Sequence, residues 1–126
     1  MDYRSRISEA MSNRNPAHAA ALYRQLLEID PSQILPRQLQ LDVANQLMSE
    51  GKWQSAADAY QKFLSLYGNY LYAEQVHLML GLLYSRYLDR PREALDHLKK
   101  AWENLTDTNQ KTMCRQEIDR LNAENI

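Results

Sequence analysis

The chain of 126 residues has one cysteine, three glycines and four prolines. Because Cys114 has no second cysteine to pair with, an internal disulfide is excluded, and the chain is compatible with a reducing compartment. Few residues break helices, while Ala, Leu, Gln, Glu, Lys and Arg are abundant, so helix is favoured over strand throughout. A chain of this length can bury one sizeable core. We therefore expect a single all-α domain over residues 1–126.

Long apolar runs and an excess of one charge are also missing. No segment approaches the ~20 apolar residues of a membrane span, and MDYRSRISEAMSN at the start lacks the apolar stretch of a signal peptide. We expect a soluble, cytoplasmic chain with no direct membrane insertion, which could be a fragment of a longer protein. Lys plus Arg (15) nearly balance Asp plus Glu (16), and a net charge of -1 offers no field that would attract nucleic acid. No nucleic acid is expected among the partners.

The residue patterns that enzymes and metal sites require are absent. The three histidines and single cysteine show no spacing that converges on a zinc ion. Gly51, Gly68 and Gly81 are isolated, so no glycine-rich loop is present to cradle a phosphate. Cys114 falls on the apolar side of the last predicted helix, where a small buried hydrophobic residue is the expected role. We expect no catalytic residues, no cofactor and no metal.

An internal repeat is present. Three stretches align on their small residues: HAAALYRQLLEIDP (18–31), SAADAYQKFLSLYG (55–68) and EALDHLKKAWENLT (93–106). Steps of 37 and then 38 residues separate the members of three columns: Ala19, Ala56 and Ala94; Tyr23, Tyr60 and Leu98; Leu26, Phe63 and Ala101. Each stretch has the periodicity of a helix with one buried stripe, and an amphipathic segment precedes it. Helical hairpins repeated at this period stack, since one hairpin cannot bury its apolar face alone.

Helix-initiating residues support these boundaries. Asn15 precedes Pro16, and Asp89 precedes Arg90-Pro91; Asn and Asp can cap free amides, and proline fits the first turn. Residues 108–123 are predicted to form a final helix, with Asp107 or Thr108 as its cap. Its apolar side would cover the last repeat, as the end cap of a solenoid does, and consists of Met113, Cys114, Ile118 and Leu121.

The repeat resembles the tetratricopeptide repeat family, whose unit is about 34 residues long. Repeat two has Val43-Ala44, Leu47, Gly51, Ala56, Tyr60 and Phe63 at the family's positions, and repeat three has Leu80-Gly81, Tyr84, Ala94, Leu98 and Ala101. The period is longer than the family's, so the chain resembles a long-period variant. The resemblance implies an α-α superhelix of three stacked hairpins, over approximately 2–31, 36–68 and 72–106, followed by the capping helix.

In this family, one side of each first helix lines a concave groove. We call the corresponding residues of this chain the groove register: Arg4, Ser5, Ser8, Met11 and Ser12 in repeat one; Gln38, Leu41, Asp42, Asn45, Met48 and Ser49 in repeat two; Gln75, Leu78, Met79, Leu82, Ser85 and Arg86 in repeat three. The predicted groove is polar at its amino end and apolar at repeat three, where we expect one side of the helix to be uncovered. Exposed apolar patches often mark interaction sites.

The resemblance implies a noncatalytic scaffold that binds a partner peptide or helix with apolar anchors. We expect the partner to contact Leu41, Asn45, Met48, Leu78, Met79, Leu82 and Arg86, with Asn45 and Arg86 setting its orientation. One subclass of the family clamps a terminal carboxylate, but Arg4 alone has the required charge at the clamp positions, so no such clamp is expected here. Other interpretations stay open: the chain's own ends could cover the apolar residues, two copies could form a homodimer, or the chain could be a dimerisation or regulatory module of a larger, even membrane-linked, protein.

Overall fold

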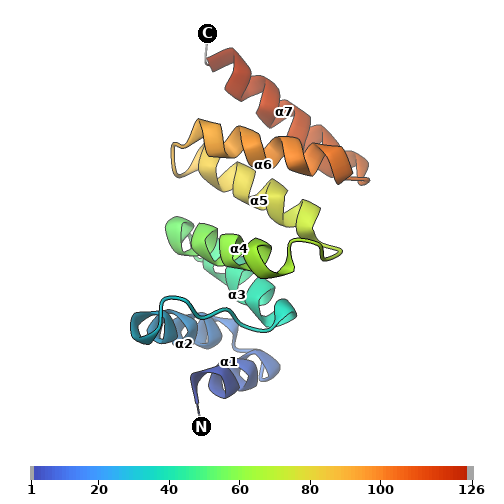
Figure 1. The fold of residues 1–126 in the computed structure, drawn as a ribbon. Coiled ribbons are helices and arrows are strands. Elements are labelled where there is room, and N and C mark those ends of the chain that lie inside the picture. Colours follow the sequence, from blue (N-terminus) through green and yellow to red (C-terminus); the bar gives the residue numbers. More distant parts are fainter. Residues whose placement is uncertain (1, 125–126) are drawn as a thin grey trace. The chain divides into compact units, whose positions relative to one another are not determined.

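The computed structural model describes residues 2–124, which form seven α-helices and no strand, so the predicted all-α fold is confirmed (Figure 1). In chain order the helices are α1 (Tyr3–Ser12), α2 (Pro16–Ile29), α3 (Arg37–Ser49), α4 (Trp53–Tyr67), α5 (Ala73–Arg86), α6 (Pro91–Asn104) and α7 (Thr108–Glu124). The chain divides into two compact units, Met1–Leu66 and Tyr67–Ile126. A single domain over residues 1–126 stays a prediction.

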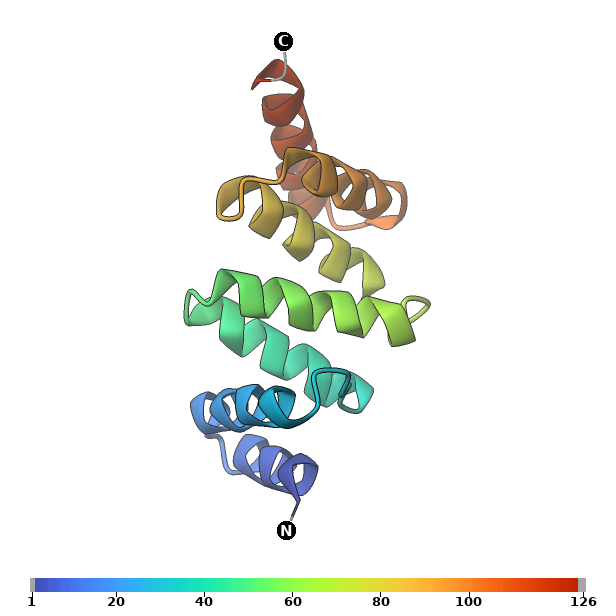
Figure 2. The same ribbon diagram turned by 60° about the vertical axis from the view of Figure 1, so that its left-hand side comes forward.

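Successive helices contact each other within each unit. In the first unit α1 packs against α2, and α2 against α3; in the second, α5 packs against α6, and α6 against α7. Figure 2 shows the hairpins formed by α1 with α2 and by α3 with α4. These contacts fit the expected series of helical hairpins. None of the helices within residues 2–124 is both long enough and apolar enough to cross a membrane.

Two of the second helices begin at the predicted prolines. Asn15 caps α2, because its Oδ1 accepts a hydrogen bond at 3.3 Å from the backbone N–H three residues further on, and Pro16 follows as the first helical residue. At α6 the position before Pro91 is Arg90, whose side chain makes no capping hydrogen bond. Asp89 instead turns the chain with a φ of 51°, a left-handed conformation that Asp tolerates better than most residues. Asp89 therefore shapes the turn and does not cap the helix.

The residues that reveal the repeat lie in the core. All nine members of the three aligned columns, which belong to α2, α4 and α6, are buried. Small residues at such positions let neighbouring helices approach closely. Gly81 on α5 is the clearest case, because a Cβ atom added there would lie 2.5 Å from side-chain atoms of Leu98 on α6. The pairing of α5 with α6 thus depends on the absence of a side chain at this position.

Gln40 connects several parts of the first unit. Its side chain is completely buried. Its Oε1 accepts a hydrogen bond from the N–H of Leu35 at 2.9 Å, and its Nε2 donates to the Tyr23 hydroxyl at 3.2 Å and to the Ala59 carbonyl at 2.9 Å. One side chain on α3 therefore links α2, α4 and the connection that precedes α3.

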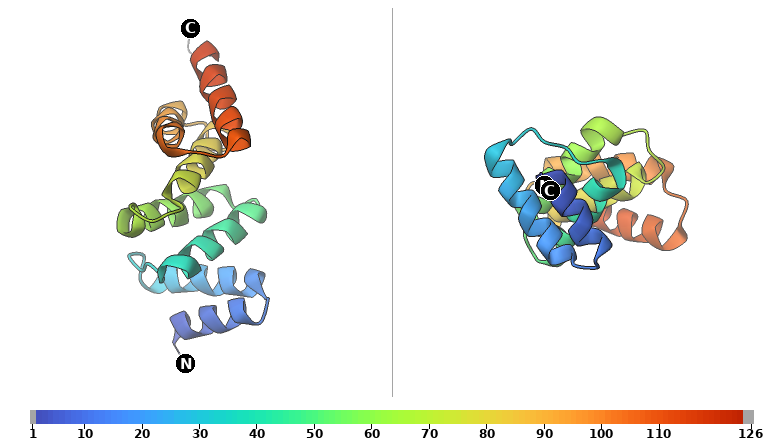
Figure 3. Two further views of the ribbon diagram at one scale, coloured as in Figure 1. Left: turned by 90° about the vertical axis from the view of Figure 1, so that its right-hand side faces the viewer. Right: turned by 90° about the horizontal axis from the view of Figure 1, so that it is seen from below.

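In the second unit, α7 packs against both α6 and α5 (Figure 3). It begins after Asp107, whose Oδ1 accepts a hydrogen bond at 2.8 Å from a backbone N–H of the first turn, as the sequence predicts. Cys114 and Leu121 are buried and Ile118 is partly buried, whereas Met113 is 41% exposed. The predicted apolar side of the last helix is confirmed except at Met113.

Candidate functional site

The groove register of α1 lies at a surface pocket of the first unit, which we call the α1–α3 pocket. Its volume is about 670 Å³.

 Four of the five groove-register residues of α1 line the α1–α3 pocket, together with one from α3: Arg4, Ser5, Ser8, Ser12 and Gln38. The remaining lining residues are Glu9, Pro36 and Leu39. The register taken from the sequence therefore coincides with a recessed part of the surface.

Six of the eight residues that line the α1–α3 pocket have polar side chains. Arg4 Nη2 donates a hydrogen bond to the Ile34 carbonyl at 2.5 Å, which ties α1 to the connection before α3. Gln38 Nε2 donates to Asp42 Oδ1 at 2.9 Å. Hydroxyl groups from three serines complete the α1 side of the lining. Such a surface can form hydrogen bonds to the backbone of a peptide.

Further along α3, Leu41 and Met48 are partly buried and Asn45 is exposed. The Tyr60 hydroxyl of α4 donates a hydrogen bond to Asn45 Oδ1 at 2.5 Å and lies 3.9 Å from Met48 Sδ. Burial raises the pKa of the Tyr60 hydroxyl, so it stays protonated and able to donate. This hydrogen bond engages Oδ1 of the exposed Asn45 side chain and leaves the orientation of its amide fixed by Tyr60.

On α5, the residues predicted to contact a partner differ in exposure. Leu78 is 3% exposed and Leu82 is 6% exposed, whereas Met79 is partly buried and Arg86 is exposed. The expectation that this apolar side is uncovered is wrong for the two leucines, which are both buried in a unit where α5 packs against α6 and α7. Direct contact between these leucines and a partner stays a prediction.

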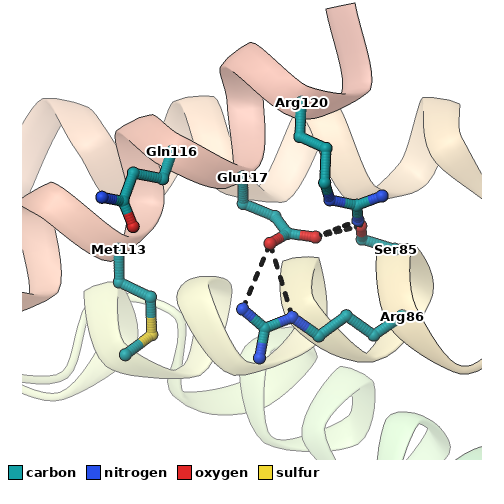
Figure 4. Close-up of a pocket in the computed structure, with 6 residues that line it drawn as sticks. All are labelled: Ser85, Arg86, Met113, Gln116, Glu117 and Arg120. Carbon is teal, nitrogen blue, oxygen red and sulfur yellow. Dashed lines mark hydrogen bonds and ion pairs between the residues drawn. The ribbon is translucent and has the colours of Figure 1, made fainter. Parts of the chain in front are cut away.

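A second pocket, the α5–α7 pocket, has a volume of about 480 Å³ (Figure 4). Two groove-register residues of α5 line it together with four residues of α7: Ser85, Arg86, Met113, Gln116, Glu117 and Arg120. In the second unit, as in the first, groove-register residues thus lie at a recessed surface.

Glu117 organises the α5–α7 pocket although it is only 4% exposed. Its Oε1 accepts hydrogen bonds from Arg86 Nε at 3.4 Å and Nη2 at 3.2 Å, and its Oε2 accepts from the Ser85 hydroxyl and from Arg120 Nη2. Burial acts to raise the pKa of this carboxyl, but the hydrogen bonds from Ser85, Arg120 and Arg86 outweigh burial and hold the pKa below its ordinary value. Sequence analysis missed Glu117 and Arg120. The available signal was the position of Glu117 on the buried face of α7.

The structure also brings two histidines together where α5 packs on α6. The Nδ1 atoms of His77 and His97 are 2.9 Å apart, and the ring of Tyr84 stacks on His97 with centroids 5.8 Å apart. Burial lowers the pKa of both histidines, that of His97 to about 4, so the pair is neutral near pH 7 and one ring donates to the other. Over residues 2–124, no three His, Cys, Asp or Glu side chains gather in a way that could hold a metal ion.

The comparisons with known proteins agree with the fold. The tetratricopeptide repeat family matches residues 39–70, which include most of α3 and all of α4. A search of curated proteins gave no match. The family match and the helical hairpins together fit a tetratricopeptide-like repeat protein. Repeats of this family generally serve as noncatalytic modules for protein–protein interaction.

Proposed function

We propose that this tetratricopeptide-like repeat chain is a noncatalytic scaffold that binds a peptide or helix of a partner protein along the groove register of its first helices. The proposal is supported by one observation: residues of the groove register line a pocket in each unit. In the α1–α3 pocket these are Arg4, Ser5, Ser8, Ser12 and Gln38, and in the α5–α7 pocket they are Ser85 and Arg86.

In the first unit, the proposed contacts are Leu41, Asn45 and Met48. The two apolar side chains are partly accessible and would supply apolar burial, while the Asn45 amide would fix the partner's orientation. The hydrogen bond from Tyr60 holds Asn45 in place before a partner arrives, so less side-chain freedom is lost on binding.

In the second unit, we propose that Met79 and Arg86 contact the partner. Met79 adapts to varied apolar surfaces because its side chain is unbranched and polarizable. Leu78 and Leu82 lie on the same side of α5 and would reach a partner only at their small exposed edges.

Selection of peptides on the immobilised full chain tests this function. A display library of random peptides should yield binders, and Met48→Glu should weaken them at least about tenfold, because a charge would enter a partly buried apolar contact. Ala21→Glu adds the same charge at an exposed position of α2, outside the groove register, and should change affinity by no more than about twofold.

The proposal fails if no peptide is selected, or if both substitutions have the same effect. The solution mass of the free chain is measured alongside. A dimer that Met48→Glu dissociates would favour a homodimer over a peptide scaffold.

A further inference from the structure

We propose that the α5–α7 pocket binds the carboxylate of an Asp or Glu side chain on the partner segment, with Arg86 and Arg120 as hydrogen-bond donors. The inference rests on the proposed function, since it names the chemistry of the partner. It concerns residues of the second unit alone.

The Arg86 guanidinium has N–H groups that Glu117 does not use. A guanidinium carries five N–H groups, and Arg86 directs only Nε and Nη2 at Glu117. Its third nitrogen, Nη1, points away from Glu117 in Figure 4. The side chains of Arg86 and Arg120 are 48% and 43% exposed, so both guanidinium groups can be reached from solvent.

The charge of the α5–α7 pocket also favours a carboxylate ligand. The lining contains two arginines and one glutamate, which leaves an excess of one positive charge. Arg120 also pairs with Glu124 at 2.9 Å, but the Glu124 side chain is 61% exposed, and such exposed pairs contribute little and are readily exchanged. One carboxylate from a partner would balance the excess. A phosphate dianion would exceed it, and the net charge of -1 supplies no wider positive field.

Glu117 is a positioning residue in this account. Because its carboxylate is buried and accepts from both arginines, it fixes the two guanidinium groups on either side of the pocket. The same carboxylate competes with a ligand for the arginine N–H groups. Removing its charge should therefore strengthen ligand binding while it weakens the contact between α5 and α7.

The remaining lining favours a protein segment over a free carboxylate. Met113 is 41% exposed and offers an apolar surface next to the charged groups, and Gln116 adds an amide. An acidic residue beside an apolar residue in a peptide matches this combination.

Two short peptides test the inference: acetyl-Ala-Leu-Glu-Leu-Ala-amide and its counterpart with Gln in place of Glu. Titration of the full chain, followed by the amide NMR signals of Ser85 and Gln116, should show the Glu peptide binding at least about fivefold more tightly. Arg86→Gln should remove this preference. Arg92→Gln, at an exposed position of α6, removes the same charge elsewhere and should retain it.

Glu117→Gln separates ligand binding from a structural role. We expect tighter binding of the Glu peptide, by about threefold, together with reduced stability. Equal binding of the two peptides, or unchanged affinity in both Arg86→Gln and Glu117→Gln, would overturn the inference. If selected library peptides depend on Met48 but not on Arg86, the inference fails and the proposed function stands. If they do not depend on Met48, the function fails, while the Glu and Gln peptides still decide the chemistry of the pocket.

Discussion

Three buried hydrogen bonds meet at Gln40, and each would lose a partner if the amide were removed. Gln40→Met preserves the length of the side chain but leaves the N–H of Leu35, the hydroxyl of Tyr23 and the carbonyl of Ala59 without this partner. We expect the free energy of unfolding to fall by about 2–4 kcal/mol, because buried polar groups without partners are costly. Urea denaturation of the purified chain measures the change.

The control is Gln38→Met, on the same helix but exposed. It removes only the hydrogen bond to Asp42 and should change stability by less than about 0.5 kcal/mol. Equal losses from the two substitutions would show that Gln40 does not have the stabilising role assigned to it.

Gln40 and Glu117 also show where sequence analysis is limited at the scale of the residue. Gln40 lies three residues before the buried Val43, and Glu117 three residues after the buried Cys114, so helical periodicity places both on buried faces. Their polar character argues against burial unless partners are present. Several of those partners are distant in the chain, 19 residues away for Ala59 and 31 for Arg86, and periodicity within one helix does not reveal them.

At the scale of the element, the helix boundaries and the aligned core columns could be predicted because they depend on local caps and periodicity. The burial of the groove-register leucines of α5 could not be predicted in this way. The burial of Leu78 and Leu82 accompanies packing of α5 by two other helices, α6 and α7. An apolar side chain has the same appearance in the sequence whether another helix or solvent faces it.

The α5–α6 hairpin should lose stability in acid. Burial lowers the pKa of His77 and His97 in the folded state, so below about pH 6.5 the unfolded chain binds protons that the folded chain does not. Stability should therefore fall as the pH drops from about 7 toward 4. Because both rings are partly exposed and screened by solvent, we expect a loss of about 1–2 kcal/mol.

Urea denaturation at several pH values measures this loss. His97→Gln should flatten the dependence, because it removes the histidine whose pKa burial lowers to about 4. His18→Gln, at an exposed position of α2, should leave the dependence as it is. An unchanged slope in His97→Gln would contradict the explanation.

At the scale of the whole molecule, the groove register includes residues that line a pocket in each of the two units. The fold could be predicted from the repeat, and the polar lining of the α1–α3 pocket from the register. The charged lining of the α5–α7 pocket could not, because two of its three charged residues, Glu117 and Arg120, lie on α7, which has no counterpart in the repeat alignment.

A map of amide chemical-shift changes over the full chain, with a peptide selected from the display library, tests the central claim most directly. The account predicts the largest changes along the groove register of the first helices, at residues such as Ser8, Asn45 and Arg86. Largest changes along α2, α4 and α6, with the first helices unaffected, would contradict it.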